Sequence, residues 1–172
     1  MGTPDINAGP VPGLLGDVAA LHGRYYAEHC GFPVFFEDKV AREMGEYLSR
    51  YDAAKVLVLW CGDHGRVTGS NTIDGSDPKL ASGQAHLRWF ILHDSLAGQG
   101  LGGRMMRQFL QFSRNASFSS VYLITLKGLG AAMSLYEKAV FKIVEEETEE
   151  TWGGRFWNNS SNSNYRPYIY YG

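Results

Sequence analysis

LRWFILHDSLAGQGLGGRMMRQFLQFSR, residues 87–114, joins three different kinds of sequence in one continuous run. Its first part, Leu87–Leu92, is short, mostly apolar and followed by His93 and Asp94, which is typical of a buried strand. Beyond Gly102, apolar residues recur at helical spacing with arginine and glutamine on the opposite side, which indicates an amphipathic helix packed on a sheet. The run therefore predicts a strand, a glycine loop and a helix.

Four glycines, Gly98, Gly100, Gly102 and Gly103, lie between the predicted strand and the predicted helix. They remove side chains where the backbone enters the helix, and the first turn of a helix carries free N–H groups at the positive end of its dipole. An anion, most readily a phosphate, would fit at this position. A flexible turn without any ligand is the competing interpretation.

The same glycines match the dinucleotide-binding spacing G-x-G-x-x-G through Gly98, Gly100 and Gly103. A dinucleotide-binding fold needs an acidic residue roughly 20 positions further on, which holds a ribose. That region is the apolar run Val121–Leu126, which contains no carboxylate. A nucleotide-binding α/β protein is therefore the weaker alternative.

The elements predicted on either side of this run are two helices before it and mostly strands after it. They are a helix that Asp17 caps and that ends before Gly31, a helix over about 37–49, a hairpin of strands over 55–61 and 66–73, a strand over 121–126, a short helix over 130–138, a strand opened by Phe141 and a closing strand over 165–171. This order is α+β rather than a regular alternation of strand and helix.

Length and composition predict one globular domain: the chain has 172 residues, of which 44% are hydrophobic. A loose arm over 1–13 precedes the expected domain over 14–172. The formal charge of −2 argues against a nucleic-acid-binding surface. Because no apolar run reaches roughly 18 residues and no signal peptide is visible, we expect a cytoplasmic protein with no membrane contact. Cys30 and Cys61 lack metal-site or disulfide spacing, so no metal is expected.

The glycine loop resembles the cofactor-binding motif of the GNAT superfamily of acyl-CoA-dependent N-acetyltransferases, which reads Arg or Gln, two residues, Gly, one residue, Gly or Ala. Gly100 and Gly102 match this motif, whereas Ala97 stands where the family has Arg or Gln. A second stretch, Ser134–Val144, is similar to the closing segment of the family, with Val140 in place of a glycine. The resemblance implies a mixed, mostly antiparallel central sheet flanked by helices.

The resemblance also implies where acetyl-CoA would bind. The coenzyme would lie where the Leu87 and Val121 strands splay apart, with its pantetheine arm along the first strand and its pyrophosphate on the glycine loop. The residues implied to contact it are Ile91, Leu92, Ala97, Gly98, Gln99, Gly100, Leu101, Gly102 and Gly103.

Two residues are candidates for catalysis. Tyr136 occupies the position of the tyrosine that protonates the leaving thiolate in many family members, although a core aromatic is the simpler interpretation. Many members use a carboxylate on the strand before the glycine loop as a base, and this strand lacks one. By alternation, His86, Arg88, Phe90 and Leu92 share one face of it. His86 could act as a base near neutral pH, and Arg88 could orient a substrate carboxylate.

A finer resemblance is to the acetyltransferase domain fused to MarR-type regulators, carried by the first helix, by the pair Leu87-Arg88 and by the stretch 125–141. In that subfamily a leucine replaces a coenzyme-contacting asparagine, and Leu129 agrees with this. His22 and Tyr25 lie one turn apart in the first helix, where the family often builds a wall of the acceptor pocket. DNA binding is not carried over.

We therefore expect direct transfer of an acetyl group from acetyl-CoA to a primary amine of a small molecule, with an amino-acid-like acceptor if Arg88 faces the site. Neither cysteine lies beside a recognisable base, which argues against a covalent intermediate. A non-catalytic acyl-CoA-binding module is the alternative, favoured by Ala97, Val140 and the missing carboxylate. Aromatic residues crowd the C-terminal end, which fits either an acceptor pocket or a homodimer interface.

Overall fold

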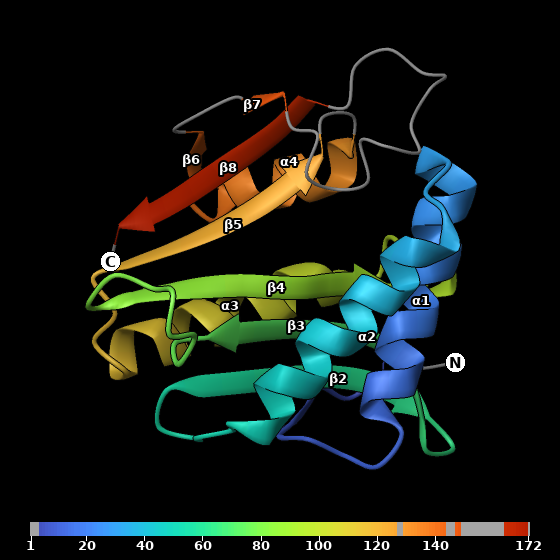
Figure 1. Ribbon diagram of the computed structural model, residues 1–172, viewed down its shortest axis with the longest axis horizontal. Coiled ribbons are helices and arrows are strands. Elements are labelled where there is room, and N and C mark those ends of the chain that lie inside the picture. The colour runs from blue at the N-terminus through green and yellow to red at the C-terminus, as the bar shows by residue number, and fades with distance from the viewer. Residues whose placement is uncertain (1–3, 127–128, 144–146, 149–163, 172) are drawn as a thin grey trace.

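The computed structural model describes residues 4–126, 129–143, 147–148 and 164–171, which form one mixed sheet with helices on both faces (Figure 1). The elements in chain order are β1 (Asn7–Ala8), α1 (Leu14–Cys30), α2 (Val34–Ser49), β2 (Val56–Asp63), β3 (Arg66–Asp74), β4 (Gln84–Leu92), a 3-10 turn (Asp94–Leu96), α3 (Leu101–Asn115), β5 (Ser120–Leu126), α4 (Gly130–Lys138), β6 (Lys142–Ile143), β7 (Glu147–Thr148) and β8 (Asn164–Tyr171). The fold class predicted from the sequence is confirmed.

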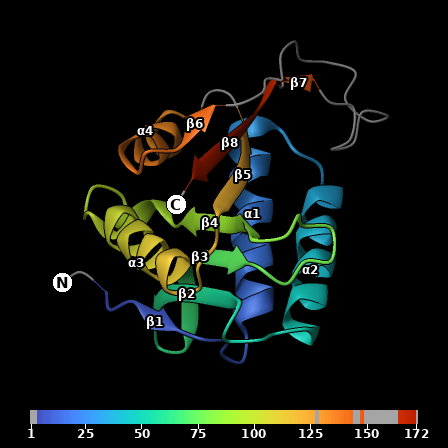
Figure 2. The same cartoon turned by 90° about the vertical axis from the view of Figure 1, so that its left-hand side faces the viewer.

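The strand order is β1-β2-β3-β4-β5-β8-β6, and β7 pairs with β8. Every pairing is antiparallel except β4 with β5, because α3 carries the chain back between these two strands. Figure 2 shows α1 and α2 on one face of the sheet and α3 and α4 on the other. The sheet is therefore buried on both sides, which explains the apolar runs in its strands.

Both N-terminal helices begin earlier than the sequence pattern predicts. α1 starts after Gly13, which adopts the left-handed conformation at φ 88°. Asp17, predicted as the cap, lies inside the helix, and its carboxylate instead accepts a hydrogen bond of 2.8 Å from the backbone N–H of Val67 in β3. A carboxylate near a helix start suits either role, and tertiary structure determines which one it takes. α2 starts directly after Pro33, whose φ of −74° suits a helix entry.

β4 contains a bulge that changes which side chains share a face. Thr72 of β3 faces Arg88 and Ser70 faces Ile91, so two residues of β4 oppose one residue of β3. Trp89, the first of these two, has a φ of 47°. As a result, Arg88 and Trp89 both point toward α2, while Phe90 points toward α3 and α4.

The predicted common face of His86, Arg88, Phe90 and Leu92 is therefore wrong. Before the bulge, Arg88 pairs with Glu43 of α2 and His86 interacts with the charge of Lys39 of α2; after it, Phe90 and Leu92 pack beside Gly102 of α3. Strict alternation holds only for a regular strand, and the inserted residue reverses it. The strand itself was predicted correctly.

β4 and β5 are paired only at their beginnings. Gln84, Ala85 and His86 pair with Ser120, Val121 and Tyr122, and beyond this point β5 pairs with β8. Figure 1 shows the two strands diverging toward α1. The splayed pair expected from the resemblance is thus present, and it opens the sheet in front of the start of α3.

Candidate active site

A cleft of about 810 Å³, called the central cleft below, lies where β4 and β5 diverge. Its walls come from α1, α2, β4, the loop after β4, the start of α3 and the length of α4. The structure brings these residues of the predicted site to its lining: His22, Tyr25, His86, Arg88, Ile91, Leu92, Ala97, Gly98, Gly100, Leu101, Gly102 and Tyr136. Gln99 and Gly103 belong to the same loop but do not line the cleft.

The glycine loop gives the cleft a floor of exposed backbone. Gly98 and Gly100 adopt positive φ angles of 74° and 71°, which side chains with a Cβ rarely take, and nothing lies within 4 Å of a Cβ added at either. No side chain caps the start of α3, and Arg104 is the first residue whose N–H reaches back to an oxygen of this helix, that of Gly100. Among the described residues, the backbone N–H groups of residues 98–103 have no hydrogen-bond partner, so they can bind an anion.

The other loop residues contribute shape. Leu101 is 1% exposed and packs in the core, so only its backbone can meet a ligand. Gly102 lies where an added Cβ would come within 3.4 Å of Leu135, so its lack of a side chain lets α3 approach α4 closely. Gln99 turns its side chain back, donating to the oxygen of Ser95 at 2.9 Å.

Tyr136 lies on α4 with its ring between the core and the central cleft. It is 5% exposed, and its ring centroid lies 6.3 Å from that of Phe90 and 6.0 Å from that of Phe141. Packing of this kind fixes the ring plane, so its position in the cleft is well defined. The sequence analysis gave two interpretations of Tyr136, a core aromatic and a site residue, and its position fits both.

His86 lies in an environment that opposes protonation. Its ring stacks on Tyr122 with a centroid distance of 4.1 Å. Burial, together with the positive charges of Arg88 and Lys39, lowers the pKa of His86 to about 3, although Asp74 acts in the opposite sense. The ring is therefore neutral near pH 7. A base that titrates near neutral pH, as expected from the sequence, does not fit this position.

Arg88 is surrounded by carboxylates. Its guanidinium pairs with Glu43 of α2 and lies 3.6 Å from Asp74 and 3.9 Å from Asp77. The side chain is 12% exposed and stacks over the ring of Trp89 at 4.3 Å. An acceptor carboxylate that binds Arg88 must therefore compete with groups of the protein itself.

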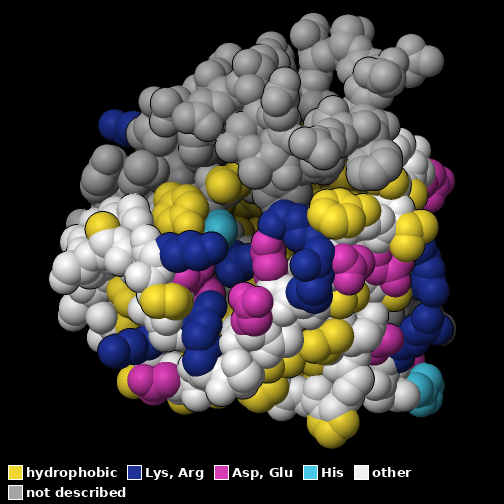
Figure 3. All heavy atoms as spheres, viewed as in Figure 1, with side chains coloured by type: hydrophobic (Ala, Val, Ile, Leu, Met, Phe, Trp, Pro, Cys, Tyr) yellow, Lys and Arg dark blue, Asp and Glu magenta, His cyan; other side chains and the backbone are white. Residues whose placement is uncertain are grey.

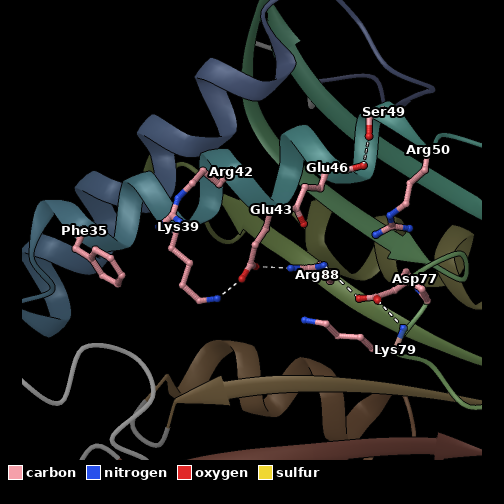
Figure 4. Close-up of a pocket in the computed structure, with 11 residues that line it drawn as sticks. Phe35, Lys39, Arg42, Glu43, Glu46, Ser49, Arg50, Asp77, Lys79 and Arg88 are labelled. Atoms are coloured by element: carbon pink, nitrogen blue, oxygen red, sulfur yellow. Dashed lines mark hydrogen bonds and ion pairs between the residues drawn. The ribbon is translucent and has the colours of Figure 1, made fainter.

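A second cavity of about 590 Å³, called the charged groove below, continues from the central cleft between α2 and the β3–β4 loop (Figure 4). Lys39, Glu43 and Arg88 line both cavities. Figure 3 shows basic and acidic side chains alternating across this face. One of the ion pairs in the groove joins Lys39 and Glu43, which lie one helical turn apart on α2.

Asp74 does not line the groove itself but pairs with two residues that do, Arg50 and Arg88. It is fully buried and receives two hydrogen bonds from Arg50, of 2.7 and 2.6 Å. Burial opposes its ionisation, but the bonds and charge of Arg50 outweigh this, and the pKa of Asp74 lies below its ordinary value. The carboxylate is therefore charged, and it holds the end of α2 to the sheet.

Sequence reasoning missed the contribution of α2 and one residue of α1. Lys39 and Glu43 line the central cleft, as does Tyr26, whose ring stacks on His22. The i, i+4 spacing of Lys39 and Glu43 was visible, but it is typical of any exposed helix face. The contact of Glu43 with Arg88 spans 45 positions of the chain, which no local pattern reveals.

Two further properties concern only the described residues. No described helix is long and apolar enough to cross a membrane. Within the same residues, no group of three or more His, Cys, Asp or Glu side chains is placed to hold a metal ion. The C-terminal aromatics Trp152, Phe156 and Trp157 lie outside the residues that the structure describes.

Known structures share this architecture. An N-acetyltransferase from Staphylococcus aureus Mu50 superposes with a TM-score of 0.72 at 11% identity, covering 98% of each chain. An acetyltransferase from Streptococcus agalactiae 2603 gives 0.68 at 18% identity, covering 100% of each chain. A Bacillus anthracis structure that contains acetyl coenzyme A gives 0.57 at 16% identity, covering 73% of this chain and 68% of the other.

No curated protein sequence matches the chain. The model of the acetyltransferase (GNAT) family matches residues 22–141, which include the central cleft from α1 to α4. The chain therefore belongs to the acetyltransferase (GNAT) family.

Proposed function

We propose that the protein transfers an acetyl group from acetyl-CoA directly to a primary amine of a small molecule. The observation that carries the proposal is the divergence of β4 and β5 in front of the uncapped start of α3, within one cleft that also contains Tyr136. This arrangement offers an extended edge, an anion site and a hydroxyl group together.

Acetyl-CoA would be held mainly by backbone. Beyond His86, β4 no longer pairs with β5, so at Ile91 and Leu92 the edge of β4 that faces away from β3 is available to the pantetheine arm. Residues 97–103 would bind the pyrophosphate through the amides at the start of α3. Ala97 offers no side-chain contact, which favours a coenzyme site built on the backbone.

The residues of the chain have separate tasks in the proposed reaction. Acetyl-CoA supplies the thioester that makes the acetyl group transferable. Tyr136 donates its hydroxyl proton to the departing thiolate, because an unprotonated thiolate is a poor product to release in an apolar cleft. His22 and Tyr25 form the acceptor side, and Arg88 orients an acceptor that carries a carboxylate. His86, neutral and stacked, contributes shape there rather than a proton.

A non-catalytic acyl-CoA-binding module is the second candidate. It is favoured by Ala97 and by Val140, which stands in a left-handed conformation at φ 66°, where the family has glycine. Ala97 and Val140 both depart from the family motifs, but neither residue blocks the central cleft. Turnover decides between the two candidates. A location in the cytoplasm, a homodimer and a closer relation to MarR-fused acetyltransferases also stand as proposals.

Calorimetric titration with acetyl-CoA, ATP and NAD tests the proposed site. Gly100→Glu should abolish acetyl-CoA binding, because its carboxylate would lie beside the anion site. Gly65→Glu is the matched control, since Gly65 has a similar φ of 77°, open space around it and a place in a distant hairpin turn. Equal loss in both variants would indicate general strain, and binding of ATP or NAD instead of acetyl-CoA would overturn the proposal.

A further inference from the structure

His22, in the middle of α1, is a buried histidine that forms a hydrogen bond through one ring nitrogen, Nδ1, among the described residues. It is 5% exposed and lines the central cleft. Its Nδ1 lies 2.8 Å from the backbone oxygen of Val18, one helical turn earlier. A carbonyl oxygen can only accept a hydrogen bond, so Nδ1 carries the proton and donates it. Nε2 of the neutral ring is then a hydrogen-bond acceptor.

Nε2 of His22 has no hydrogen-bond partner among the described residues. The ring stacks on Tyr26, with centroids 6.0 Å and planes 6° apart, so both its plane and its rotation are fixed. Nε2 is not among the side-chain atoms that are both shut off from solvent and without a partner, so it is open to the cleft that His22 lines. Because His22 lines the central cleft, a donor can reach Nε2 from a molecule bound there.

The position of α1 in the fold places Nε2 of His22 on the side of the cleft opposite to Tyr136. α1 crosses the end of β4 at which β5 diverges (Figure 1), and it lies on the face of the sheet opposite to α4 (Figure 2). A group held between the two strands therefore has Tyr136 on one side and His22 on the other. A proton donor for the leaving group and an acceptor for the incoming group are needed on separate sides.

His22 is better suited to this task than His86. Burial lowers the pKa of His22 to about 4 and leaves the ring neutral, with its lone pair available. Burial and the charge of Arg88 lower the pKa of His86 as well, to about 3, so the two pKa values do not separate the histidines. Their surroundings do, because a proton arriving at His86 would meet the fixed cation of Arg88. In the part of the chain that the structure describes, no carbonyl fixes the tautomer of His86, whereas the oxygen of Val18 fixes that of His22.

We infer that Nε2 of His22 accepts a hydrogen bond from the N–H of the acceptor amine and takes that proton as the amide forms. The inference rests on the proposed acetyl transfer. The amine nitrogen bonds to the acetyl carbonyl carbon, and the carbon–sulfur bond breaks with its electron pair going to sulfur. The amine proton passes to His22, and Tyr136 protonates the sulfur. Water then removes the proton from His22 and returns one to Tyr136, so charge and atoms balance.

Two substitutions of His22 test the role of Nε2 independently of the role of the aromatic ring. His22→Phe keeps the aromatic stack on Tyr26 and removes Nε2, whereas His22→Gln restores an acceptor through its amide oxygen. With acetyl-CoA and a panel of benzylamine, ethanolamine and lysine, His22→Phe should lower kcat about 100-fold or more. The Kd for acetyl-CoA should stay unchanged. His22→Gln, whose amide oxygen accepts a hydrogen bond but cannot take a proton, should bring the KM for the amine back toward the wild-type value without restoring kcat. Arg24→Gln, exposed on the same helix, is the control.

NMR of protein labelled with 15N-histidine provides a readout that a purely structural role would not change. His22 should show a protonated Nδ1 and an unprotonated Nε2, and the Nε2 resonance should shift when benzylamine is added with CoA. A protonated Nε2, or His22→Phe with the wild-type kcat, would overturn the inference and leave acetyl transfer intact. A wild-type protein that binds acetyl-CoA but acetylates no amine of the panel would overturn both.

Discussion

The guanidinium carbon of Arg88 lies 4.3 Å from the ring centroid of Trp89, its neighbour in β4. Adjacent residues of a regular strand point to opposite faces, so this contact exists only because the bulge turns both side chains toward α2. β4 pairs with β5 only as far as His86, before the bulge, and Arg88 lies at the junction of the two cavities. The conformation of Trp89 thus determines which side chains of β4 face α2 and which face α3 and α4.

Freeing Arg88 should improve binding of acceptors that carry a carboxylate. Glu43→Gln removes one of the charges that pair with Arg88 while keeping the side-chain length, so an acceptor carboxylate meets less competition for the guanidinium, and Asp74 and Asp77 remain. We expect the KM for β-alanine to fall severalfold and the KM for propylamine, which has no carboxylate, to change little. Steady-state kinetics with both amines at saturating acetyl-CoA measures the difference.

Glu46→Gln is the control for Glu43→Gln, because Glu46 lies one turn further along the groove and makes no described contact with Arg88. Arg88→Ala is less informative by itself, since it also leaves the buried Asp74 with fewer partners and should destabilise the fold. If Glu43→Gln changed KM equally for β-alanine and propylamine, recognition of an acceptor carboxylate by Arg88 would be wrong.

Val140→Gly should stabilise the protein. Val140 adopts a φ of 66°, a conformation that costs a β-branched residue about 1–2 kcal/mol, and it is 65% exposed, so little packing is lost. We expect an increase of about 1 kcal/mol in the free energy of unfolding, measured by urea denaturation. Val34→Gly, at an exposed helical position, should decrease it. A decrease for both variants would show that flexibility of the unfolded chain outweighs the strain.

Most of the fold could be predicted from the sequence because its elements carry local signals. The apolar runs of β2 and β5, the 3.6-residue period of α3 and the His64-Gly65 turn each depend on neighbouring residues alone. The start of α1 and the bulge in β4 could not be predicted in this way. Asp17 has the chemistry of a cap but bonds to Val67, 50 positions away.

The candidate site likewise contains some features that local sequence patterns predict and others that depend on tertiary structure. Gly98, Gly100 and Tyr136 belong to contiguous sequence patterns, so they could be predicted as site residues from the chain alone. The pairing of Glu43 with Arg88 depends on how α2 packs across the sheet, and the low pKa of His86 depends on its burial beside Arg88. Neither the Glu43–Arg88 pair nor the low pKa of His86 has a sequence signature, and both change the roles expected for the polar residues of β4.

The two cleft histidines should make the fold sensitive to acid. Burial lowers the pKa of His22 to about 4, and burial with the charge of Arg88 lowers that of His86 to about 3, whereas an unfolded chain titrates near 6.5. Below pH 6.5 the unfolded chain binds more protons than the folded one. Stability that is fully present above pH 6.5 is therefore lost progressively toward pH 4.

Urea denaturation at pH 7.5 and pH 5 measures this loss. Each histidine should contribute about 2 kcal/mol to it at pH 5. His22→Phe, which cannot be protonated, should reduce the difference between the two pH values by that amount, because carboxylate effects are common to both proteins. Curves for wild type and His22→Phe that run parallel between these pH values would contradict the buried, neutral state of His22.

Tyr136→Phe tests whether the cleft catalyses or only binds. The substitution keeps the ring that packs near Phe90 and Phe141 and removes the hydroxyl proposed to protonate the thiolate. We expect kcat to fall about 100-fold with an unchanged Kd for acetyl-CoA, and Tyr51→Phe, outside the central cleft, should leave kcat unaltered. If Tyr136→Phe kept the wild-type kcat, the thiolate would be protonated by another group or by water. A wild-type protein with no turnover would instead favour the binding module, since Tyr136 would then only pack.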